Sequence, residues 1–82
     1  MNDELDLARL PRSLEITGLG RSTFYGNIRV DLMTPGVEIG PGSRGWPVGE
    51  LRQINQARIR GDSEEEIRAL VRRLREARKV PT

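Results

Sequence analysis

The chain has 82 residues, of which 35% are apolar and 4% aromatic, so it has room for one small domain with a thin core, which argues against an enzyme with a deep pocket. It contains neither cysteine nor histidine, which excludes thiol and imidazole catalysis, disulfides and the usual zinc sites. The longest apolar run is three residues, 69–71, too short to span a membrane. We expect a cytoplasmic binding module without metal or cofactor.

Charge is distributed unevenly along the chain. Fourteen basic and twelve acidic residues give a net charge of +2. The first eight residues hold three acids and no base, whereas residues 9–60 hold eight arginines against four acids. Arginine suits forked contacts with phosphate and guanine. Two interpretations stay open, a solvated basic surface or an anionic partner.

The first part of the chain predicts a leader and two short helices. Residues 1–8 are expected to form a disordered acidic leader. Pro11 suits the first turn of a helix that ends at Gly18. Gly20 then serves as the N-cap of a second helix, which begins at Arg21 and runs to about Asp31. Two helices joined by such a glycine turn are typical of a helix-turn-helix.

The second helix has two contrasting sides. Phe24 and Ile28 stand one turn apart and define the inward side. The other side carries short polar groups and arginine but no carboxylate: Ser22, Thr23, Gly26, Arg29 and Val30, flanked by Tyr25 and Asn27. A surface that meets phosphates has to be free of acids, so we favour a binding surface over a solvated one.

Residues 34–49 are rich in glycine and proline and predict a small β-hairpin. Residues 37–39 alternate like a strand, residues 40–43 have turn chemistry, and residues 44–46 return as a second strand. Arg44 is expected near the tip of this hairpin. Trp46, at its end, is expected to be a core residue.

Two further helices follow. Pro47 opens the third, with Leu51, Ile54 and the aliphatic stem of Arg58 expected on one side. Ser63 and Glu66 have the spacing of a capping box at the start of the fourth. The fourth helix carries an apolar stripe at helical spacing: Ile67, Leu70, Val71 and Leu74. The stripe packs either on its own domain or on a partner or second copy.

The expected fold is therefore mainly α with a small β-hairpin, a winged helix-turn-helix followed by a C-terminal helix. Residues 9–60 form the winged helix-turn-helix and residues 61–82 the amphipathic helix and tail.

Residues 10–46 resemble the AlpA-like prophage regulators and the related excisionases. The residues that carry the resemblance are Leu10-Pro11, Leu14, Thr17-Gly18-Leu19, Arg21-Ser22-Thr23, Tyr25, Ile28-Arg29, Gly40-Pro41, Ser43 and Gly45-Trp46. The resemblance implies a MerR-like winged helix-turn-helix whose second helix enters the major groove while the wing touches the backbone or the minor groove. It also implies a bacterial, nucleoid-associated role in mobile-element gene control, in excision as a recombination directionality factor, or in both.

The chain departs from the family pattern at three positions. Gly26 stands where the family usually has Arg or Lys, Gly20 replaces a serine cap, and Glu38 puts an acid on the wing. A glycine inside a helix costs about 1 kcal/mol relative to alanine. The missing side chain either lets the helix backbone approach DNA closely or simply loses a contact. Because the glycine has this cost, we expect the close approach.

The expected DNA contacts divide into positioning and reading. Arg21 and Arg44 are assigned to phosphate or the minor groove. The candidates for base edges are Ser22, Thr23, Tyr25, Asn27 and Arg29, with Asn27 suited to adenine and Arg29 to guanine. For Tyr25, packing against the core is an equal alternative.

One module of this size covers roughly 600–1,000 Å² of protein surface on DNA, which rarely provides affinity and selectivity alone. We therefore expect additional affinity from other molecules. These are either further copies of the chain, associating through the stripe of the fourth helix, or a partner such as an integrase or RNA polymerase. The alternative function is a protein-interaction adaptor that does not bind DNA. The carboxylates form no pair placed for acid–base chemistry, so no enzymatic function is expected.

Overall fold

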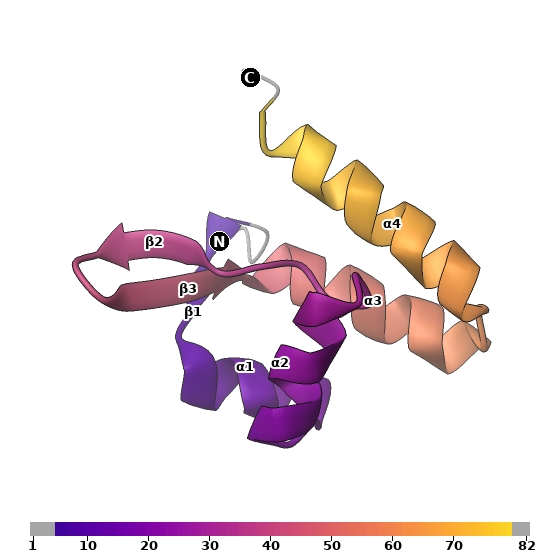
Figure 1. The fold of residues 1–82 in the computed structure, drawn as a ribbon, viewed down its shortest axis with the longest axis horizontal. Coiled ribbons are helices and arrows are strands. Elements are labelled where there is room, and N and C mark those ends of the chain that lie inside the picture. Colours follow the sequence, from indigo (N-terminus) through magenta and orange to yellow (C-terminus); the bar gives the residue numbers. More distant parts are fainter. Residues whose placement is uncertain (1–4, 80–82) are drawn as a thin grey trace.

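The computed structural model describes residues 5–79 as four helices and a small antiparallel sheet (Figure 1). In chain order the elements are β1 (Leu7–Ala8), α1 (Leu10–Thr17), α2 (Arg21–Arg29), β2 (Val37–Gly40), β3 (Ser43–Pro47), α3 (Val48–Arg60) and α4 (Glu64–Ala77). The expectation of a mainly α domain with a small β-hairpin is confirmed.

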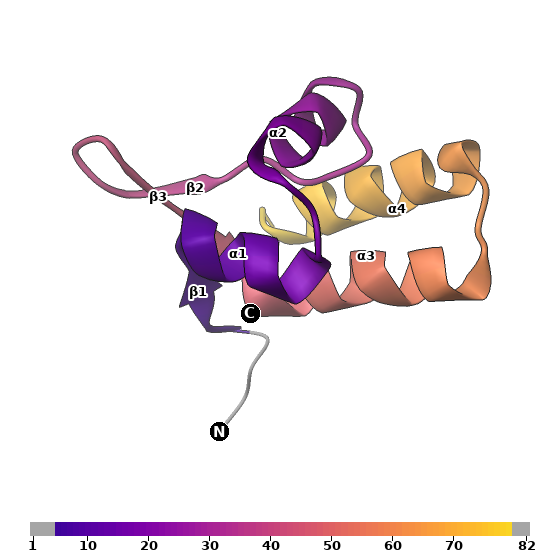
Figure 2. The same ribbon diagram turned by 90° about the horizontal axis from the view of Figure 1, so that it is seen from below.

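Strands β2 and β3 form the predicted hairpin, which extends away from the helices in Figure 2. Pro41 and Gly42 occupy its turn, and Gly42 has a φ of 71°. A proline followed by a glycine with positive φ is a sequence typical of a type II turn. In the register of the hairpin, Glu38 lies opposite Arg44 and Val37 opposite Gly45.

A third strand, β1, was not predicted. Leu7 pairs with Pro47 and Ala8 with Trp46, which places β3 in the middle of the sheet. Ala8 is only 1% exposed. The prediction of a disordered leader is therefore wrong at residues 7–8, because backbone pairing to β3 orders this segment. Residues 1–4 of that leader lie outside the described residues.

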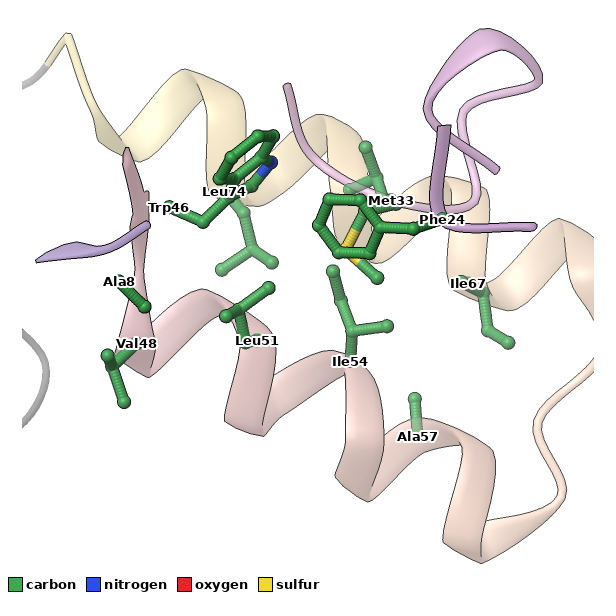
Figure 3. Close-up of a cluster of buried hydrophobic side chains, with 11 residues drawn as sticks. Ala8, Phe24, Met33, Trp46, Val48, Leu51, Ile54, Ala57, Ile67 and Leu74 are labelled. Carbon is green, nitrogen blue, oxygen red and sulfur yellow. The ribbon is translucent and has the colours of Figure 1, made fainter. Parts of the chain in front are cut away.

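The core lies between α2, α3, α4 and the sheet (Figure 3). Trp46 is 1% exposed and Phe24 is fully buried, as predicted. Helix α3 buries Leu51 and Ile54, also as predicted, but the next inward residue is Ala57 rather than Arg58, whose side chain is exposed. Ala57 follows Ile54 at the i+3 spacing of one helix face, so no charged stem is needed there.

Helix α4 begins at a complete capping box. The Ser63 hydroxyl accepts a hydrogen bond from the Glu66 amide (3.1 Å), and the Glu66 carboxylate accepts one from the Ser63 amide (2.7 Å). The α4 stripe faces the core: Ile67, Val71 and Leu74 are buried and Leu70 is partly buried against them. Of the two alternatives for this stripe, packing on its own domain is the one realised. Ile67, Val71 and Leu74 are therefore not exposed for self-association, and Leu70 is the one member of the stripe that stays partly exposed.

Within residues 5–79, no helix combines the length and the apolar content needed to cross a membrane.

Candidate nucleic-acid interface

Helices α1 and α2 are joined by the glycine turn that the sequence predicts. Gly18 adopts a left-handed conformation (φ 72°), and its amide donates to the Leu14 carbonyl (2.8 Å), which ends α1. Gly20 is extended and acts as N-cap, so α2 starts at Arg21 as predicted. It ends at Arg29 rather than near Asp31, because Asp31 itself adopts a left-handed conformation (φ 63°) that no helix continues.

The outward side of α2 carries the predicted contact residues. Phe24 is fully buried, and Ile28 packs against the core. The residues with exposed side chains are Arg21, Ser22, Thr23, Tyr25 and Arg29, while Gly26 and Asn27 are half-buried on the same helix. Helix α2 contains no acidic residue, so its exposed surface combines hydrogen-bonding groups with two guanidinium groups and no opposing charge.

Three aromatic rings join α2 to the hairpin. The ring centroids of Phe24 and Trp46 lie 5.1 Å apart and those of Tyr25 and Trp46 lie 6.5 Å apart, both edge to face. The Trp46 indole N–H also donates to the Thr34 carbonyl (3.0 Å). The Trp46 side chain belongs to β3 and packs on two rings of α2, so this contact sets where α2 lies relative to the hairpin.

Tyr25 combines the two roles that the sequence left open. Its ring packs against Trp46, yet 40% of the residue is exposed. The ring is therefore held by the core while part of it reaches the outward surface.

Arg44 lies on the same face of the hairpin as the residue that packs against α2, Trp46. Alternation along β3 puts its side chain on the same sheet face as Trp46. Its guanidinium donates to the Gly36 carbonyl (3.3 Å) and remains exposed. Arg44 thus lies two residues after Gly42 of the turn, near the tip as predicted, while its side chain reaches back toward Gly36 at the base of the hairpin. Glu38, opposite Arg44 in the register, brings an acid to this same surface.

Arg9 is a cation beside the hairpin that the sequence did not single out. It precedes α1, and its guanidinium lies 3.4 Å from the Ser43 hydroxyl at the start of β3. The two residues are 34 positions apart, and no local pattern connects them. Arg9 therefore adds an exposed positive charge next to the hairpin turn.

Helix α4 holds the C-terminal end of α2. The Arg68 guanidinium donates to the Val30 carbonyl (2.9 Å), and an Arg75 nitrogen lies 3.9 Å from the Asp31 carboxylate. A cation at the C-terminal end of a helix complements its dipole and satisfies a free carbonyl. The two ends of α2 are thus fixed differently, one by a glycine turn and the other by α4.

No protein-family model, no curated protein and no solved structure matches this chain at a significant level.

Proposed function

We propose that the protein is a sequence-specific binder of double-stranded DNA with a winged helix-turn-helix, in which α2 is the recognition helix and the β2–β3 hairpin is the wing. Helix α2 enters the major groove, and the hairpin contacts the backbone or the minor groove. The observation that carries this proposal is the exposed, carboxylate-free side of α2. This helix packs through Phe24 and Tyr25 on Trp46 of the hairpin that bears Arg44.

Within this proposal the side chains divide by chemistry. Arg21 and Arg44 bind phosphate, because both are exposed cations at the edges of the surface. Asn27 and Arg29 supply the forked hydrogen bonds that distinguish adenine and guanine, and Ser22, Thr23 and Tyr25 add shorter contacts.

The resemblance to AlpA-like regulators and excisionases supports a role in a prophage or integrative element. The protein then acts in excision, in transcriptional control or in both, with an integrase or RNA polymerase as its partner. Both roles use the same DNA-binding surface.

Replacing Arg21 or Arg44 by alanine is expected to weaken binding to all duplexes by a similar factor. Each loss of a phosphate contact lowers the slope of log affinity against log salt concentration by about one unit. Gel shifts or anisotropy titrations across a salt series measure this slope. Arg58→Ala, which removes an exposed cation from α3, is the control and leaves the slope unchanged. Unchanged slopes for Arg21→Ala and Arg44→Ala would contradict the phosphate assignment.

Gly26→Ala is expected to raise the stability of the free protein and to weaken DNA binding. A Cβ at this position meets only the far end of the Arg29 side chain, at 4.0 Å, so alanine fits and adds about 0.5–1 kcal/mol of helix stability. The added methyl group, however, separates the helix backbone from the groove. Thermal denaturation and a duplex titration test the two effects, and unchanged affinity would remove the close-approach role of Gly26.

Glu38→Gln is expected to tighten binding to an arbitrary duplex several-fold and to steepen the salt dependence. The carboxylate lies opposite Arg44 in the hairpin register, so it repels the phosphates that Arg44 attracts. Glu76→Gln makes the same charge change on α4 and serves as the control. Equal effects of the two substitutions would mean that only net charge matters.

The alternative function is a protein-interaction adaptor that does not bind DNA. The modest net charge of +2 and the acid at Glu38 favour it. Absence of binding to any duplex at low salt, where non-specific binding is strongest, would select this alternative.

A further inference from the structure

A groove of about 900 Å³ runs along the C-terminal half of α4. Pro35 forms one side of it, and the rest comes from α4 and the two residues that follow. Ala69 and Ala77 are the small apolar residues of its lining. Because alanine side chains are short, they leave a shallow hollow between the longer side chains around them.

Several cations line this groove, and they differ in how they are partnered. Arg78 is bound to the Glu50 carboxylate, with contacts of 2.8 and 2.6 Å. Arg75 lies at the limit of ion-pair distance from Asp31. Arg72 and Arg73 are exposed, and within residues 5–79 no carboxylate lies within ion-pair distance of either. Two guanidinium groups are therefore available to a ligand.

The helical spacing brings these two groups to one place. Arg72 and Arg73 follow Ala69 at i+3 and i+4, the positions that neighbour it on the helix surface. A ligand group seated over Ala69 thus lies between two guanidinium groups. Guanidinium binds carboxylate and phosphate through two parallel hydrogen bonds.

We infer that this groove is a docking site for an acidic polypeptide segment. Carboxylates of the segment pair with Arg72 and Arg73, and its small apolar side chains cover Ala69 and Ala77. The two alanines of the lining favour a polypeptide over a nucleic acid, because small apolar side chains pack on them and a charged phosphate gains nothing from that contact.

The acidic residues of α4 also favour a polypeptide. A phosphate backbone carries a charge at every nucleotide, so along α4 it would meet Glu76 in the lining and the acids of the first turn, Glu64 to Glu66. A peptide can place uncharged residues opposite these acids.

The test uses the full chain and a fluorescein-labelled peptide of repeating Glu-Leu-Ala-Glu units, followed by fluorescence anisotropy. We expect the wild type to bind this peptide and not the matching peptide with Gln in place of Glu. The double variant Arg72→Gln/Arg73→Gln should bind it about tenfold more weakly, as two exposed ion pairs within their usual range of strength predict. The matched control, Arg12→Gln/Arg58→Gln, removes the same charge from exposed sites on α1 and α3 and should change binding less than about twofold. Equal melting temperatures of the two variants show that both are folded.

Duplex titrations of the same proteins separate this inference from the proposed function. If Arg72→Gln/Arg73→Gln weakens duplex binding while peptide binding is unaffected, the groove serves DNA and the inference is overturned. It is also overturned if the wild type does not bind the peptide or if both double variants lose peptide affinity equally. If the wild type binds the peptide at this groove but binds no duplex, the inference stands and the proposed function is wrong.

Discussion

A chain that ends at Gly61 is expected not to fold. Helix α4 contributes Ile67, Val71 and Leu74 to the core, and burial of each such side chain stabilises a protein by about 1.5–3 kcal/mol. A domain of this size has a total stability near the lower end of the usual range, about 5 kcal/mol. Losing three core side chains therefore removes as much free energy of unfolding as the whole domain has. Circular dichroism on heating should show no cooperative transition for the truncated chain.

A single substitution tests the same point without removing a helix. Val71, which is 1% exposed, lies in the middle of the stripe, and Val71→Ala is expected to cost about 2 kcal/mol by removing buried methyl groups. Arg72→Ala, at the next and exposed position, should change stability by less than about 0.5 kcal/mol. A truncated chain that keeps a cooperative transition would instead make α4 an accessory element.

Arg78→Leu is expected to lower the free energy of unfolding by about 2–4 kcal/mol. The Glu50 side chain is only 10% exposed, and Arg78 binds both of its carboxylate oxygens. Removing the cation leaves a nearly buried carboxylate without its partner, which costs more than the pair itself contributes. The Pro35 carbonyl also loses a hydrogen bond from the same guanidinium (2.9 Å).

The double variant Glu50→Leu/Arg78→Leu provides the control. Because no charge is then left unpaired, most of the stability should return. Urea denaturation of the wild type, the single variants and the double variant gives the coupling free energy. Effects of Glu50→Leu and Arg78→Leu that simply add would show that the ion pair does not couple α3 to α4.

Signals that lie within a few residues of one another predicted most of this fold. Gly18 and Gly20 mark the junction of α1 and α2, the Pro41-Gly42 turn marks the hairpin, and Ser63 with Glu66 marks the start of α4. Each of these is a local conformational or hydrogen-bonding preference, so the neighbouring residues alone are enough to predict it. The exposed side of α2 was predictable for the same reason, since Phe24 and Ile28 fix its rotation.

Features that depend on contacts between distant segments were not predictable. Strand β1 has two residues, too few to show an alternating pattern, and it forms because β3 offers backbone partners to Leu7 and Ala8. The contact between Arg68 and the Val30 carbonyl joins residues 38 positions apart. Such contacts arise only after the helices have packed, so the sequence alone does not reveal which arginine caps which helix.

Trp46 is the only tryptophan in the chain, and it is buried against Phe24 and Tyr25. Its fluorescence therefore reports on the packing of this one site. Exposure of the indole on denaturation should shift its emission to longer wavelength without any added dye. A ligand that moves α2 relative to the hairpin should also change this emission, so binding and unfolding become measurable on one unlabelled sample.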